Sequence, residues 1–184
     1  MNRWIALPLL LVSAALVVAV ATADGAQGPV ERGSYIVNSF GCFDCHTPQK
    51  PGPTGLVPDR DRFMSGHPET LALPPAPKLP EGPWMVTTTG TLTAWSGPWG
   101  TSFTANLTPD PETGIGTWTE DQFVQAIRTG RHQGMGRPIL PPMPIGAISN
   151  MTDDDLRAIF AYLKSLKPIK NRVPDPIPPA DAGE

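Results

Sequence analysis

The stretch GCFDCHTP, residues 41–48, holds both cysteines of the 184-residue chain, three positions apart, with a histidine directly after the second. In a helical turn this spacing places the Cys42 and Cys45 thiols about one turn apart, with the His46 imidazole beside the second thiol. No comparable group occurs elsewhere, because the chain has 2 cysteines and 3 histidines in all. The function of this stretch therefore has to be explained from its own few residues.

The Cys-x-x-Cys-His motif favours covalent attachment of haem c, in which each thiol adds to one vinyl group of the porphyrin and the histidine binds the iron. Three other interpretations stay open. A disulfide between the two cysteines would close a ring too small to stabilise the chain much. A thioredoxin-like redox pair is expected between a strand and a helix, whereas prolines follow this motif closely. A zinc site needs further Cys or His ligands close by.

The N-terminal segment is typical of export. Residues 4–20 are almost wholly apolar and follow one arginine, and small residues at positions 19, 21 and 23 offer cleavage sites. We expect residues 1–23 to be a signal peptide, with an uncleaved membrane anchor as the alternative. In both cases the folded part would be periplasmic, and contact with a membrane would depend on an uncleaved segment.

Composition restricts the rest of the chain. The 24 prolines and 18 glycines predict long irregular segments, and the length allows one modest core. We expect one domain over residues 29–168 and a proline-rich, extended tail over residues 169–184. The net charge of −3, without a basic cluster, indicates that nucleic acid is not a partner.

Secondary-structure signals are uneven along the chain. Residues 29–42 have apolar positions that suit a short helix, whereas proline and glycine interrupt residues 47–116 every few positions. Within that region residues 84–95 are β-prone and predict a small hairpin around Gly90.

Two helices are predicted near the C-terminus. Thr119 and Gln122 form a capping-box pattern, which predicts a helix over residues 120–129. Thr152 precedes three aspartates and a series of apolar residues at helical spacing, and Pro168 closes this pattern. The sequence therefore predicts a final amphipathic helix that starts after Thr152.

A haem iron bound by His46 needs a second axial ligand or keeps an open face. A thioether raises the reduction potential and favours electron transfer. Met143 lies between Pro142 and Pro144, which restrict the local backbone and would hold the sulfur in place. We predict Met143 as the second ligand, with His132 or Met135 as alternatives and an open site as the last one.

Taken together, these features resemble the class I c-type cytochromes. The resemblance rests on GCFDCH after a short helix, a methionine in PPMP far downstream and a closing amphipathic helix. The phrases NLTPDPETGIGTW, AIRTGRH and MTDDDLRAIFAYLKSL are similar to single-haem bacterial cytochromes and to domains of multi-haem subunits that accept electrons from periplasmic dehydrogenases. The similarity covers most of residues 31–167, although residues 47–105 are longer and richer in proline than a minimal cytochrome requires.

The resemblance implies an all-α, class I cytochrome c-like fold of short helices around one covalently bound haem, with long Pro/Gly-rich loops. Cys42 and Cys45 would be the thioether anchors, His46 the proximal ligand and Met143 the distal ligand. The chain would then be an electron carrier and not an enzyme, passing single electrons between a dehydrogenase and an oxidase or cytochrome acceptor. The alternative is a peroxidase-like haem enzyme or gas sensor with an open iron site, for which His67 or His132 would supply a distal acid or base.

Overall fold

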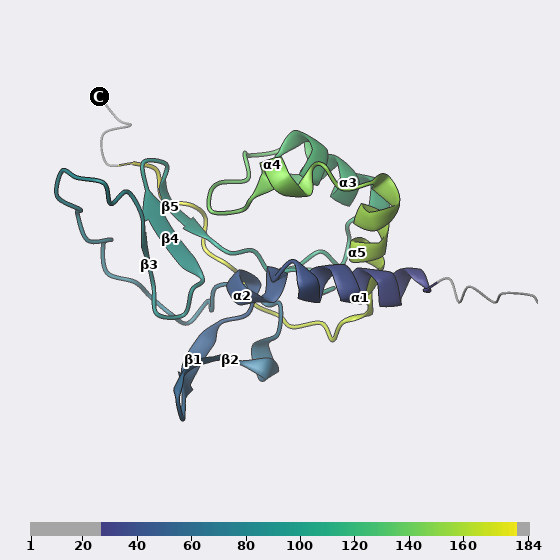
Figure 1. Cartoon of the computed structure of the whole chain (residues 1–184), viewed down its shortest axis with the longest axis horizontal. Coiled ribbons are helices and arrows are strands. Elements are labelled where there is room, and N and C mark those ends of the chain that lie inside the picture. The colour runs from purple at the N-terminus through teal and green to yellow at the C-terminus, as the bar shows by residue number, and fades with distance from the viewer. Residues whose placement is uncertain (1–26, 180–184) are drawn as a thin grey trace, which may run out of the picture.

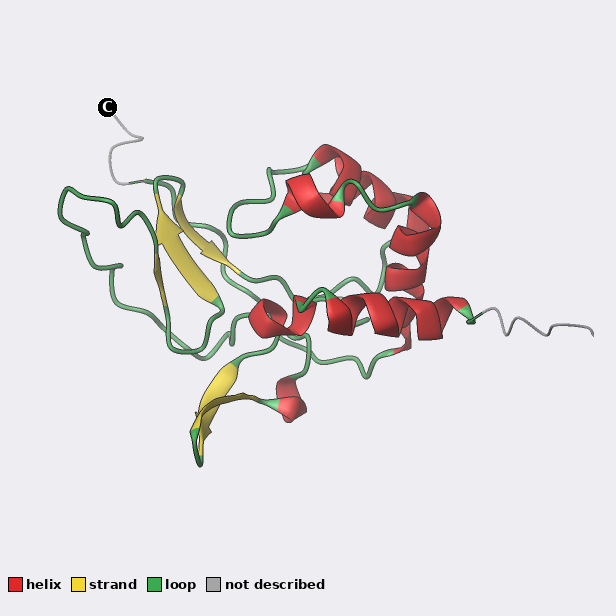
Figure 2. Ribbon diagram, viewed as in Figure 1, coloured by secondary structure: helices red, strands yellow, loops and turns green. Residues whose placement is uncertain are grey.

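The structure is a computed structural model that describes residues 27–179. The predicted signal peptide and residues 180–184 of the predicted tail lie outside the described residues. Most of the helices lie at one end of the molecule and the two small sheets at the other (Figure 1 and Figure 2). Among residues 27–179, no helix has the length and apolar character needed to cross a membrane.

Helices α1 (Pro29–Ser39) and α5 (Asp153–Ser165) pack against each other and form much of the core. Their close approach depends on Gly33, because a Cβ at this position would clash with the carbonyl oxygen of Ala158. Val37 of α1 and Leu156 of α5 are completely buried beside this crossing. The predicted helices in residues 29–42 and after Thr152 are both confirmed.

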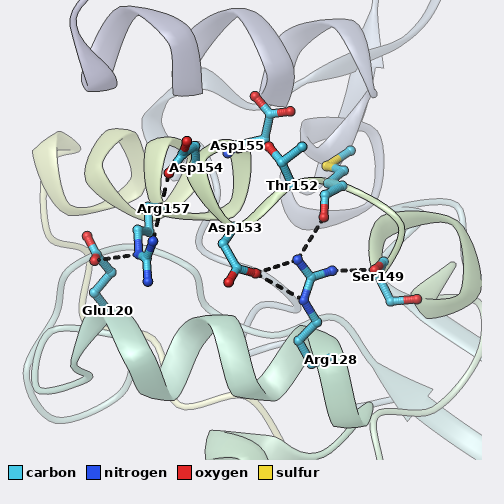
Figure 3. A network of polar contacts seen from close by, with 9 residues as sticks. Glu120, Arg128, Ser149, Thr152, Asp153, Asp154, Asp155 and Arg157 are labelled. Carbon is cyan, nitrogen blue, oxygen red and sulfur yellow. Dashed lines mark hydrogen bonds and ion pairs between the residues drawn. The ribbon is translucent and has the colours of Figure 1, made fainter.

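Helix α3 (Glu120–Thr129) has the predicted bounds. The Thr119 hydroxyl accepts a hydrogen bond from the Gln122 backbone N–H, and the Gln122 side chain accepts one from the Thr119 backbone N–H. Gly130 ends the helix in the left-handed conformation that glycine adopts without strain. On the surface between α3 and α5, Arg157 pairs with Glu120 at 3.1 Å (Figure 3).

Arg128, near the end of α3, holds the connection between helix α4 (Ile145–Ile148) and α5. Its guanidinium donates hydrogen bonds to the carbonyl oxygens of Ser149 and Met151 and to the carboxylate of Asp153 (Figure 3). One side chain of α3 thus binds the two carbonyls between α4 and α5 and a carboxylate in the first turn of α5.

The expectation of an all-α fold is only partly correct, because residues 47–105 include short strands. Strands β1 (Gln49–Gly52) and β2 (Gly55–Pro58) form an antiparallel hairpin. Strands β3 (Thr87–Thr88), β4 (Ala94–Gly97) and β5 (Gly100–Phe103) form an antiparallel sheet in that order. The predicted hairpin around Gly90 is confirmed, since β3 and β4 pair across it.

Short helical turns and the C-terminal segment complete the described chain. Helix α2 (Cys42–His46) follows α1, and 3-10 turns occupy Arg60–Arg62 and His132–Gly134. Residues 169–179 return across the molecule and pair with β5 through a bridge between Ile177 and Thr101. The C-terminal segment therefore contacts both the loop that contains Asn106 and the larger sheet.

Candidate functional site

The Cys-x-x-Cys-His motif forms the single turn of α2. Gly41 links α1 to α2 with a φ of 73°, a left-handed conformation that a residue with a Cβ would adopt only with strain. Both cysteines are free and partly exposed. A helix, not a strand, precedes the motif, which differs from the thioredoxin-like arrangement. Residues 27–179 also contain no cluster of three or more His, Cys, Asp or Glu side chains suited to a metal ion, so the zinc interpretation finds no ligand set there.

His46 is buried, and its ring orientation is fixed by a backbone carbonyl. Nδ1 lies 2.8 Å from the carbonyl oxygen of Ala105, so the N–H sits on Nδ1 and the lone pair on Nε2. Burial lowers the pKa of His46 below the ordinary value of 6.5, and the hydrogen bond to Ala105 opposes this effect. At neutral pH the side chain is therefore a neutral imidazole with one nitrogen available as a ligand.

The segment that contains Gly66 lies between α2 and the residues around Ala105. The Gly66 N–H donates to the His46 carbonyl at 2.9 Å, and the His67 N–H donates to the Thr104 carbonyl at 2.9 Å. A Cβ on Gly66 would clash with the Thr104 carbonyl oxygen, so glycine permits this close packing. His46 and the carbonyl that orients it are thus held by one continuous set of backbone contacts.

A cavity of about 550 Å³ adjoins α2. Cys42, Cys45, His46 and Met143 all line it, so the structure brings the four predicted site residues together. Its size is typical of small-molecule and cofactor sites. Apolar side chains from widely separated parts of the sequence contribute to the wall, among them Val37, Phe103, Ile115, Phe123, Ile148 and Leu156.

The alternative ligands are placed differently. His132 also lines the cavity, and its ring packs edge-on against Trp118 with 4.8 Å between the ring centroids. Met135 is 89% exposed and is not part of the cavity wall, which gives no support to it as a ligand. His67 is completely buried and is not part of the wall either. Of the two histidines proposed as a distal acid or base, only His132 therefore reaches the cavity.

Sequence reasoning did not single out Met64, which lines the cavity and is completely buried. Its backbone N–H donates a hydrogen bond at 3.0 Å to the hydroxyl of Thr47, the residue that directly follows His46 in the chain. Met64 thus belongs to the part of the wall next to α2. A buried methionine in a core is common, and its sequence context offers no signal of a special role.

Arg137 and Arg172 also line the cavity and are exposed. Neither guanidinium forms an ion pair with a carboxylate among residues 27–179. Arg137 comes from the loop before Met143, whereas Arg172 comes from the C-terminal segment. Two positive charges are therefore available to an anionic group bound in the cavity.

These residues fit a haem c. The cavity combines apolar walls with two free thiols, a neutral imidazole, a thioether and two guanidinium groups. The imidazole and the thioether are ligands that haem iron takes, and the thiols and guanidinium groups suit a porphyrin with vinyl and carboxylate side groups.

No model of a known protein family matches the chain. It is 42% identical over 77 residues to one of the subunits of nicotinate dehydrogenase from Pseudomonas putida, a match that covers 42% of this chain and 6% of that protein. It is 29% identical over 155 residues to the cytochrome c subunit of an alcohol dehydrogenase (quinone) of Gluconobacter oxydans, covering 83% of this chain and 25% of that protein. The fructose dehydrogenase cytochrome subunit of Gluconobacter japonicus is 27% identical over 141 residues, which are 76% of this chain and 22% of that protein.

The chain thus spans a quarter or less of the length of these relatives. Over most of its own length, however, its relatives are cytochrome c subunits of dehydrogenases. This similarity confirms the resemblance that the motifs indicate.

Proposed function

We propose that this relative of cytochrome c subunits is a c-type cytochrome domain that transfers single electrons between a dehydrogenase and a respiratory acceptor. The observation that carries the proposal is the convergence of Cys42, Cys45, His46 and Met143 on one apolar cavity. The chain has one Cys-x-x-Cys-His motif, which indicates one covalent haem c. The helices around this cavity would form a class I cytochrome c-like fold, with the strands of residues 47–105 as an addition.

Cys42 and Cys45 would anchor the porphyrin. Each of the two cysteines would be joined to one vinyl group of the porphyrin by a thioether bond, a linkage whose formation requires no oxidant. Burial raises the pKa of Cys42 to about 11 and also raises the pKa of Cys45 above 9.0. Both groups are therefore thiols at neutral pH, and oxidation or disulfide exchange, which requires the thiolate, is suppressed.

His46 and Met143 would be the axial ligands. His46 offers Nε2, because Nδ1 carries the proton that is donated to Ala105. Met143 offers a thioether from a proline-rich loop on the wall of the same cavity. When bound, the haem supplies one iron that alternates between the ferric and ferrous states and so carries one electron. A His/Met pair would favour electron transfer because it raises the reduction potential.

Arg137 and Arg172 would hold the haem carboxylates. Both reach the cavity and neither is neutralised by a carboxylate among the described residues. Guanidinium groups bind carboxylates with two parallel hydrogen bonds and remain charged at any relevant pH. This arrangement would leave the iron itself in apolar surroundings.

Cellular context follows from the same proposal. Residues 1–23 would direct export to the periplasm, residues 29–168 would form the cytochrome domain and residues 169–184 its C-terminal tail. The electron donor would be a dehydrogenase, since the relatives are named as dehydrogenase subunits. The acceptor would be an oxidase or another cytochrome, and a membrane contact would require residues 1–23 to remain attached.

The proposal is tested on protein produced with haem c maturation. Mass spectrometry should show the chain plus one haem that resists acid–acetone extraction. Met143→Ala should lower the reduction potential, abolish the sulfur-to-iron charge-transfer band and allow ferrous iron to bind carbon monoxide.

Met135→Ala is the matched control and should change none of these properties, because Met135 points to solvent. Extractable haem would contradict covalent attachment. Wild-type ferrous protein that binds carbon monoxide freely would favour the haem enzyme or gas sensor instead.

A further inference from the structure

A hydroxyl group from the larger sheet reaches the loop that carries Met143. Ser102 lies in β5, is 7% exposed and lines the cavity. Its Oγ donates a hydrogen bond to the carbonyl oxygen of Pro141 at 2.5 Å. Pro141 is two residues before Met143, so this bond fixes the chain directly ahead of the thioether.

The Ser102 hydroxyl is itself held in place. In the sheet, Ser102 pairs with Trp95 of β4. Trp99 Nε1 donates to Ser102 Oγ at 3.3 Å, which occupies one lone pair of the oxygen and leaves its hydrogen for an acceptor. Ser102 Oγ lies 3.4 Å from the Trp95 carbonyl oxygen and 2.5 Å from that of Pro141. The hydroxyl hydrogen of Ser102 therefore points mainly to Pro141.

The prolines restrict the local backbone of this loop, but the loop makes few hydrogen bonds of its own, so its position relative to the sheet depends on contacts from outside it. Three of the five residues 140–144 are prolines, which have no backbone N–H to donate. The hydrogen bonds of Met143 are local: its N–H reaches the Leu140 carbonyl at 3.3 Å, and its carbonyl accepts from the Ile145 N–H at 2.8 Å. Local bonds shape the loop but do not set its distance from the rest of the cavity wall.

We propose that Ser102 is a positioning residue for the Met143 thioether, and that the β3-β4-β5 sheet supports the ligand loop. The inference rests on the proposed function, in which Met143 binds the haem iron. It assigns a role to part of residues 47–105, the region that a minimal cytochrome does not require. Without the Ser102 bond, the loop can move away from the cavity and the thioether leaves the iron more often.

The test compares three variants of the haem-loaded protein. Ser102→Ala removes the hydroxyl with little change in volume, and Ser102→Thr restores it. Ser96→Ala removes a hydroxyl of β4 in the same sheet, which accepts a hydrogen bond from Thr101 at 3.2 Å and, among the described residues, makes none to the loop. The measurements are the pH at which the ferric charge-transfer band is lost and the rate at which ferrous protein binds carbon monoxide.

Ser102→Ala should lose the band at a lower pH than wild type and bind carbon monoxide about fivefold faster, which is the factor that corresponds to the net free energy of one hydrogen bond. Ser102→Thr and Ser96→Ala should behave like wild type. If Ser102→Ala and Ser96→Ala change both readouts equally, the hydroxyl acts through the stability of the sheet alone and the proposal is wrong.

The failure of this inference is distinguishable from that of the proposed function. A Ser102→Ala protein with wild-type spectra and carbon monoxide kinetics, alongside a Met143→Ala protein that has lost the band, would overturn the role of Ser102 only. A wild-type protein without the band, or one in which Met143→Ala has no effect, would overturn the axial assignment itself.

Discussion

His67 is a completely buried histidine that lies beside the site without lining its cavity. Its Nε2–H donates to the Leu71 carbonyl at 3.2 Å, and its Nδ1 accepts from the Thr93 hydroxyl at 2.9 Å. The ring also packs against Phe103 with 4.9 Å between centroids. Burial lowers the pKa of His67 below 6.5, so the neutral imidazole is the form that the fold accommodates.

This residue should make stability depend on pH. Below pH 6.5 the unfolded chain binds a proton at His67 that the folded chain does not yet bind, so the free energy of unfolding should fall between pH 7 and pH 5. His67→Gln should reduce that dependence and cost about 1–3 kcal/mol at pH 7 through lost buried hydrogen bonds. Unfolding of the haem-loaded protein by guanidinium chloride at several pH values measures both effects.

Thr93→Val is the companion variant, because it removes the hydroxyl donor and keeps the imidazole. It should destabilise the protein at pH 7 but retain the decline towards pH 5. An unchanged slope in His67→Gln would show that other groups cause the pH dependence.

Individual site residues differ in how well a sequence can reveal them. Cys42, Cys45 and His46 are contiguous, so their spacing alone indicates the chemistry, and Met143 is marked by its flanking prolines. The carbonyl of Ala105 lies 59 residues from His46 and acts through the backbone, which leaves no trace in residue type. Ser102 is equally inconspicuous, because a serine in a Gly/Ser/Thr-rich strand has no distinctive pattern.

At the level of secondary-structure elements, Arg128 is the contact that joins α3 to the connection between α4 and α5. Its bonds to the Ser149 and Met151 carbonyls satisfy acceptors that helix ends leave open. The same guanidinium lowers the pKa of Asp153, chiefly through its hydrogen bond to that carboxylate. Arg128 thereby fixes residues 149–153, which follow Met143 in the chain after the short helix α4.

Arg128→Ala should lower the free energy of unfolding by about 1–2 kcal/mol, because two carbonyl acceptors lose their donor. Arg157→Ala, which removes the neighbouring ion pair with Glu120 (Figure 3), should cost less than about 0.5 kcal/mol, since both partners are largely exposed. Chemical unfolding at pH 7 compares the two variants.

The pH dependence adds a second criterion. The contribution of Asp153 is present above its ordinary pKa of 3.8 and disappears as pH falls through its lowered folded value. The difference between wild type and Arg128→Ala should therefore shrink in acid. Equal destabilisation by Arg128→Ala and Arg157→Ala would contradict the special role of Arg128.

Elements were predictable where local signals agree. The capping box, apolar face and terminal glycine of α3 all indicate one helix, and its bounds match. Strands β1 and β2 were expected as loop because Pro51 and Pro58 lie within them, yet a two-stranded hairpin tolerates prolines whose missing N–H faces outward. Strand β5 depends on pairing with β4, a contact that no local propensity encodes.

Across the whole molecule, Asn171 ties the C-terminal segment to a region about 100 residues earlier. Its side-chain amide donates to the carbonyls of Ser65 and His67 at 2.7 and 2.8 Å. Its side-chain oxygen accepts from the Arg62 guanidinium at 2.8 Å and from the Glu69 N–H at 2.9 Å. Asn171 is completely buried, so every one of these bonds lies in or next to the interior.

Asn171→Ala should be among the more damaging single substitutions. It leaves several polar groups without partners, which corresponds to a loss of about 2–4 kcal/mol in the free energy of unfolding. The adjacent Lys170→Ala removes only an exposed ion pair with Glu112 and should have no measurable effect. Thermal unfolding of the two variants gives the comparison, and a mild effect of Asn171→Ala would show that water replaces its bonds.

The position of Asn171 near the C-terminus also has a consequence for biogenesis. A polypeptide is synthesised from its N-terminus, so residues 42–46 emerge early and residues 169–179 emerge late. The contacts of Asn171 with residues 62–69 can form only after almost the whole chain has been delivered. The two thiols of the Cys-x-x-Cys-His motif therefore emerge well before the segment that completes the buried contacts of Asn171.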